Sequence, residues 1–142
     1  MHVMSEEEWK AFLTASPRTA KLATVRKDGR PHVAPVWIDL DDDGTIVFTT
    51  GSESLKGRTL RRDPRVCLCV DDDRPPFSFV IVDGTAEISE DPDELLRWAT
   101  RIGGRYMGAA DAEAFGKRNA VPGELLVRVR PTNVVAQAAI AD

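Results

Sequence analysis

Apolar and polar positions alternate at every second residue over much of the chain, which is typical of strands that bury one face. Turn signals separate these runs, most clearly Asp28-Gly29 and Asp43-Gly44. Within the longest run, Asp83-Gly84 predicts a bulge or kink. The pattern predicts six strands, at residues 19–25, 31–40, 45–50, 65–70, 77–89 and 124–135.

Apolar positions at helical spacing predict short helices between and beside these strands. Ser5-Glu6-Glu7-Glu8 has the form of a capping box, and Trp9, Phe12 and Leu13 follow on one helical face. The predicted helices cover residues 6–15, 53–62, 91–101 and 111–117, and Gly103-Gly104 is expected to interrupt the third. Strands joined mostly by hairpins, with helices at the periphery, predict a mainly β fold, an antiparallel barrel.

Length and composition narrow the classes of protein. A chain of 142 residues suits one domain, with residues 1–4 and 138–142 expected to be flexible ends. The net charge of −4 and the lack of a long basic stripe argue against nucleic-acid binding. No apolar run is long enough to span a membrane, and the first residues do not read as a signal peptide. We therefore expect a cytoplasmic protein.

The segment from Thr49 to Arg65 is the strongest candidate for a ligand site. A β-branched strand ends in a hydroxyl-rich turn that opens a short helix; the hydroxyls and cations are Ser52, Ser54, Thr59, Lys56, Arg58, Arg61 and Arg62. The start of a helix offers unpaired N–H groups and a partial positive charge, so this turn is able to cradle a phosphate. The alternative is a solvated helix with an ordinary serine cap, whose arginines pair with nearby acids.

Other candidate chemistry is sparse. His32 has no evident partner and either contacts a ligand or lies at the surface near a strand end. Cys67 and Cys69 lie in an apolar run and are expected to be buried core thiols. The acidic run from Asp39 to Gly44 lacks the last glutamate and the helical flanks of a calcium loop. We predict no metal site and name no catalytic side chain.

Several short motifs, in their order along the chain, resemble a known family. They are Thr24 to Trp37, Thr49-Thr50, Ser54-Leu55-Lys56, Asp63-Pro64-Arg65-Val66, Asp83-Gly84-Thr85-Ala86 and Gly104-Arg105-Tyr106-Met107-Gly108. The ordered set resembles the pyridoxamine 5′-phosphate oxidase-like superfamily over residues 5–137. Within it, the chain is most similar to the actinobacterial flavin/deazaflavin oxidoreductases of the B class. The resemblance implies a six-stranded antiparallel split β-barrel that forms a homodimer.

The resemblance also implies which residues bind a cofactor. Lys56 takes the place of the family's phosphate lysine, and the other implied positions are His32, Val33, Ala34, Pro35, Val36, Thr49, Thr50, Ser52, Ser54, Thr59, Phe77 and Phe79. Residues 32–36 fall on the strand that contacts the ring, and Phe77 or Phe79 corresponds to an aromatic residue given by the other subunit. Many relatives carry a further basic residue near Ser54 or Leu55 and an asparagine at the position of Thr59, and this departure leaves the number of charge contacts open.

The function that the resemblance implies is hydride transfer from reduced coenzyme F-420, a deazaflavin, to an unsaturated small-molecule substrate. An FMN-binding oxidoreductase with the same phosphate cradle is one alternative, and a non-catalytic F-420 carrier is another. The sequence leaves open the substrate, the choice between F-420 and FMN, and whether Arg58 or Arg61 contacts the anionic tail of F-420.

Overall fold

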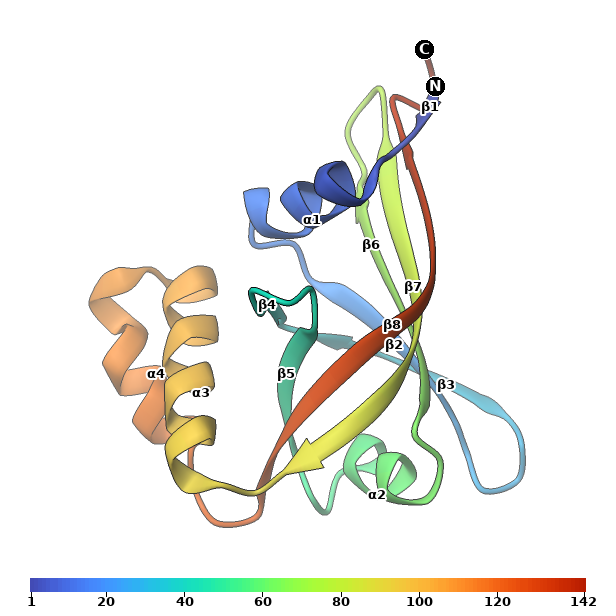
Figure 1. The fold of residues 1–142 in the computed structure, drawn as a ribbon. Helices are drawn as coiled ribbons and strands as arrows, with labels where there is room; N and C mark the ends of the chain where they lie inside the picture. Colours follow the sequence, from blue (N-terminus) through green and yellow to red (C-terminus); the bar gives the residue numbers. More distant parts are fainter.

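One antiparallel sheet curls around the hydrophobic core in the computed structural model, which describes residues 1–142 (Figure 1). Its strands are β1 (His2–Val3), β2 (Ala20–Val25), β3 (Pro31–Val36), β4 (Asp39–Leu40), β5 (Ile46–Gly51), β6 (Arg65–Asp72), β7 (Ser78–Ser89) and β8 (Glu124–Ala138). They pair in the order β3-β2-β6-β7-β8-β5-β4, and β1 pairs with β8. The mainly β, antiparallel fold is confirmed. The count is eight strands and not six, because the two-residue strands β1 and β4 form separately.

Helices lie around this curled sheet (Figure 1): α1 (Glu6–Ala15), α2 (Leu55–Arg62), α3 (Pro92–Met107) and α4 (Ala112–Asn119), with a short 3-10 turn at Ala109–Asp111. Helix α1 begins at the predicted capping box, in which the Glu8 N–H donates to Ser5 Oγ at 3.2 Å and the Ser5 N–H donates to Glu8 Oε1 at 3.0 Å. Its buried Trp9 and Leu13 belong to the main core. None of the helices combines the length and the hydropathy needed to cross a bilayer.

The predicted interruption at Gly103-Gly104 is wrong, since α3 continues to Met107. A Cβ atom built on Gly103 would lie 2.5 Å from the Cβ atom of Phe115, and one on Gly104 would lie 2.9 Å from that of Ala112. These glycines therefore allow α4 to pack closely on α3, and they do not end the helix.

The cysteines also differ from expectation. At the chain ends, His2–Val3 pairs with Gln137 and Ala138 of β8, and the flexibility of residues 1–4 and 138–142 stays a prediction. Cys67 and Cys69 are free and only half-buried, because the alternate residues of β6 occupy the core face. The predicted bulge at Asp83-Gly84 is confirmed by a register shift between β7 and β8.

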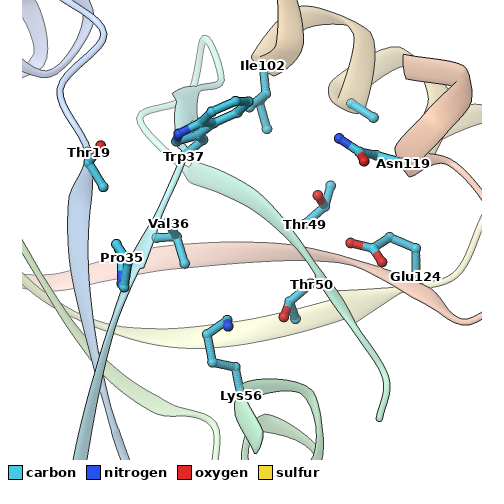
Figure 2. Close-up of a pocket in the computed structure, with 11 residues that line it drawn as sticks. Thr19, Pro35, Val36, Trp37, Thr49, Thr50, Lys56, Ile102, Asn119 and Glu124 are labelled. Atoms are coloured by element: carbon cyan, nitrogen blue, oxygen red, sulfur yellow. The ribbon is translucent and has the colours of Figure 1, made fainter. Parts of the chain in front are cut away.

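The sheet closes only partly into a barrel, because β3 and β5 do not pair with each other. The chain leaves β3, passes through Trp37 and Ile38, and enters β4, which does pair with β5. The two strands therefore meet at β4 and diverge from there, leaving a gap between β3 and β5 that we call the split (Figure 2).

Two apolar clusters stabilise this arrangement. Twenty buried side chains fill the inside of the curl, including Phe48, Leu22 and Leu68. A second cluster of Val47, Leu95, Trp98 and Leu126 joins α3 to the opposite face of β5 and β8. Since α3 is anchored there by a fully buried tryptophan, its far end reaches the top of the split.

Candidate functional site

A cleft of about 460 Å³ occupies the split (Figure 2), a size typical of sites for small molecules. The side chains that define its chemistry are Pro35, Val36, Trp37, Thr49, Thr50, Lys56, Asn119 and Glu124. One wall is apolar and comes from β3, and the other carries hydroxyl, amide and carboxyl groups from β5, α4 and β8. Five of the predicted cofactor-binding residues meet here: Pro35, Val36, Thr49, Thr50 and Lys56.

The turn between β5 and α2 builds the lower end of the cleft. Ser54 is the N-cap of α2 and accepts the Gly57 N–H at 3.0 Å. Its hydroxyl also donates to the Gly51 carbonyl at 2.8 Å and lies 3.0 Å from the Thr50 hydroxyl. The serine-cap alternative therefore describes Ser54, whose hydroxyl is engaged in fixing the turn. The same bonds fix the position of Thr50 in the cleft.

Lys56 lies in the first turn of α2, and its ammonium group points into the cleft toward Thr50 and the strand that carries Pro35 (Figure 2). It is the only cationic side chain that lines the cleft, and it forms no ion pair. A free ammonium beside a helix N-terminus is suited to hold an anionic group such as a phosphate.

Glu124 is a site residue that sequence reasoning missed. It is the first residue of β8, pairs in register with Gly51, and directs its carboxyl group into the cleft (Figure 2). Burial raises the pKa of this carboxyl, more than the Thr49 hydroxyl and the Lys56 ammonium lower it. A lone acid at the start of a strand has no sequence signature, because only the β5–β8 register brings it beside Lys56.

Trp37 forms the upper end of the cleft, and the end of α3 supports it. The Tyr106 hydroxyl accepts the Ile38 N–H at 3.2 Å, next to Trp37. Asp39, the residue that opens β4, pairs with Arg101 at 3.4 Å and with Arg105 at 3.6 Å. The motif around Arg105-Tyr106 therefore acts by positioning the segment between β3 and β4.

A second hollow of about 630 Å³ lies between α2 and the β2–β3 turn. We call it the basic hollow, because Arg26, Lys27, Arg58 and Arg62 line it and none of them pairs with a carboxylate. One acid, Asp28, also lines it and pairs with Arg30 at 3.7 Å. Thr59 also lines it, fully buried and with no hydrogen-bond partner for its hydroxyl oxygen. Arg61 faces elsewhere and pairs with Glu90 at 3.1 Å.

The remaining predicted residues lie outside the cleft. His32 and Ala34 point to the inner side of β3, where the Nδ1 atom of His32 is buried without a partner. Val33 points outward and is exposed, and Ser52 lies in the turn, where its N–H donates to the Gly123 carbonyl at 2.7 Å. Phe77 precedes β7 and Phe79 is its second residue, and neither lines the cleft of its own chain. Their role at the site of a partner subunit stays a prediction.

The lining of the cleft offers a site for an anionic ligand. Its ionisable side chains are Lys56 and Glu124, and its hydroxyl groups are those of Thr19, Thr49 and Thr50. An apolar wall, a cation at a helix start and a volume of about 460 Å³ fit a flat ligand that carries an anionic group.

Comparison with known proteins agrees with this geometry. Residues 5–138 match the family described as pyridoxamine 5′-phosphate oxidase. A pyridoxine/pyridoxamine 5′-phosphate oxidase of Myxococcus xanthus is 33% identical over 103 residues, which cover 72% of this chain and 50% of that enzyme. The chain thus spans about half the length of the curated relatives it matches.

Two solved structures extend the comparison. A conserved hypothetical protein of Mycobacterium tuberculosis has a TM-score of 0.85 and 33% identity, over 96% of this chain and 86% of that one. An F-420 reductase has a TM-score of 0.67 and 29% identity, over 87% of this chain and 94% of that one.

Proposed function

The chain belongs to the pyridoxamine 5′-phosphate oxidase family, and we propose that it is an oxidoreductase that uses coenzyme F-420 to reduce an unsaturated organic substrate. One observation carries the proposal. Helix α2 borders both the cleft and the basic hollow, with Lys56 on one side and Arg58 and Arg62 on the other. A ligand with a flat ring, one phosphate and a polyanionic tail would place the ring in the cleft, the phosphate at Lys56 and the tail in the basic hollow.

The basic hollow supports F-420 over FMN. F-420 continues beyond its phosphate into a tail of glutamates, whereas FMN ends at the phosphate. Four cations without carboxylate partners, in a chain of net charge −4, give such a tail a complementary surface. Of the two arginines left open by the sequence, Arg58 lines the hollow and Arg61 is engaged by Glu90.

The chain's own residues would bind and orient the coenzyme, which supplies the hydride chemistry when bound. Lys56 and the N–H groups at the start of α2 would hold the phosphate. Pro35, Val36 and Trp37 would offer a flat apolar surface and keep water from the ring. No side chain of the cleft needs to form a covalent intermediate.

FMN is the second candidate, and the family itself favours it. Members of the family bind flavins such as FMN, and the curated relatives are named as pyridoxine/pyridoxamine 5′-phosphate oxidases. The same Lys56 and helix start would serve its phosphate. With either coenzyme, the protein would be an oxidoreductase of the flavin-binding type.

Equilibrium titration of the purified protein with F-420 and with FMN in one buffer tests the choice. We expect tighter binding of F-420, and oxidation of reduced F-420 when a quinone or an unsaturated lactone is added. Tighter binding of FMN would reverse the assignment. Binding of F-420 without turnover of any acceptor would point to the carrier alternative.

We further propose that two copies of the chain associate through the outer face of the sheet. Val33 and Val135 are 62% and 45% exposed there. In the paired register Val33 lies beside Ala23 and Cys67, and Val135 lies beside Ile81 and Cys69 in the neighbouring row. Exposed apolar side chains in these two rows are the surface that a second copy would cover. Sedimentation equilibrium should give a dimer, and Val33→Asp should shift it toward the monomer. A monomeric wild-type protein would contradict the proposal.

A further inference from the structure

Lys56 and Glu124 are the only ionisable side chains that line the cleft, and they carry opposite charges. They approach it from different elements, Lys56 from α2 and Glu124 from β8. They do not form an ion pair with each other, so both groups remain available to a ligand.

Glu124 lies close to the turn that forms the phosphate cradle. Its backbone pairs with Gly51, the residue that follows Thr50. The Oε2 atom lies 3.9 Å from the position of a Cβ atom built on Gly51, so the carboxyl group covers the end of β5. Figure 2 shows it on the wall opposite β3, above Lys56 and Thr50. An anion held by Lys56 would therefore lie within the field of this carboxylate.

We propose that Glu124 is a specificity-determining residue, whose carboxylate makes the cleft select a phosphodiester over a terminal phosphomonoester. The proposal rests on the proposed function, in that it places the ligand's phosphate beside Lys56. A diester carries one negative charge, whereas a monoester carries about −1.5 to −2 at pH 7. One ammonium balances the diester. The second charge of a monoester is left facing Glu124 without a cation, and like charges at short range disfavour each other.

The same repulsion links binding to protonation. Burial already raises the pKa of Glu124, and a dianion beside Lys56 would raise it further. The groups that face this carboxyl are Lys56 from α2, the Thr49 hydroxyl from β5 and the Asn119 amide from α4. On its other side lies Glu90, which is paired with Arg61. Binding of a monoester should therefore be accompanied by greater proton uptake at Glu124 than binding of a diester.

Titration of wild type and Glu124→Gln with FMN, a monoester, and with F-420, a diester, tests the proposal at pH 8. We expect Glu124→Gln to bind FMN roughly tenfold more tightly, the factor that corresponds to one pKa unit, and to bind F-420 less than threefold more tightly. Glu53→Gln is the matched control, because it removes an exposed charge from the adjacent turn and leaves the cleft lining unchanged. Asn119→Asp, which adds a carboxylate to the cleft, should weaken FMN binding more than F-420 binding.

An unchanged ratio of the two affinities in Glu124→Gln would overturn the proposal. If the wild type binds neither coenzyme, the proposed function fails. The selectivity of Glu124 for a singly charged anion is then tested with simpler anions. The Glu124 carboxyl, followed by carbon NMR across a pH series, should titrate at higher pH in sulfate, which stays a dianion over this range, than in dimethyl phosphate, a monoanion. Identical titration curves in the two anions would by themselves contradict the proposed role of Glu124.

Discussion

Tyr106 stacks on Trp37 with nearly parallel rings, whose centroids lie 4.9 Å apart and whose planes differ by 3°. The Tyr106 hydroxyl donates to the Arg18 carbonyl at 2.6 Å and accepts the Ile38 N–H. One side chain at the end of α3 thus fixes both the segment that precedes β2 and the segment that joins β3 to β4. The upper wall of the cleft depends on it.

Replacement of Tyr106 by Phe should keep the stack and remove both hydrogen bonds. The Ile38 N–H then loses its partner, so we expect the free energy of unfolding to fall by about 1–2 kcal/mol in urea denaturation. Tyr106→Leu should cost about 1 kcal/mol more, because the stack on Trp37 is lost as well. Equal stabilities of wild type and Tyr106→Phe would show that these bonds are replaced by water.

Lys56→Met should weaken coenzyme binding by about 1.5–3 kcal/mol, the scale of a hydrogen bond to a charged group. Methionine keeps much of the side-chain length, so the change removes mainly the charge. Fluorescence titration with F-420 or FMN measures the loss. Arg61→Met is the control on the same helix, because Arg61 pairs with Glu90 outside both hollows. Undiminished affinity in Lys56→Met would remove the phosphate assignment.

Arg58→Ala should weaken F-420 binding and leave FMN binding unchanged, because only F-420 extends into the basic hollow. Arg58 is exposed, so the expected loss is about 0.2–1 kcal/mol and should shrink as salt is added. Titrations at low and high salt separate this effect from a change in fold. An equal loss for the two coenzymes would place Arg58 at the shared phosphate instead of at the tail.

Gly57→Ala should destabilise the protein, although alanine normally favours a helix over glycine by about 1 kcal/mol. A Cβ atom at Gly57 would collide with the carbonyl oxygen of Gly51, and that atom belongs to rigid backbone. We expect a loss of about 1–3 kcal/mol in thermal or urea unfolding, the scale of overpacking. Coenzyme affinity should fall too, because α2 carries Lys56. A raised melting temperature would contradict this account of the contact.

Local signals were sufficient for much of the fold. The capping box at Ser5 and the bulge at Asp83-Gly84 depend on neighbouring residues, and both form as predicted. Gly103-Gly104 was misread because the reason for two glycines is the approach of α4, a tertiary contact that a helical pattern does not contain. The same holds for β1, whose two residues become a strand only because β8 lies beside them.

The residues of the site also fall into those that a local pattern indicates and those that depend on tertiary contacts. Lys56 was found because a hydroxyl-rich turn before a cation is a local pattern. The sequence does not separate His32 and Val33 from Pro35 and Val36, because only the last residues of β3, next to the passage to β4, line the cleft. Glu124 is 68 positions from Lys56 in sequence, and only the pairing of β5 with β8 makes them neighbours.

The strands on either side of the split are linked behind it by the ladder β2-β6-β7-β8, and in front by the short passage from β3 to β4. Opening or narrowing the gap would therefore bend a continuous hydrogen-bonded sheet, which is costly, instead of moving a loop. We therefore expect the cleft to keep the spacing of its walls when a ligand binds. Association should then be limited by diffusion and by the electrostatic pull of α2, with little conformational adjustment on capture.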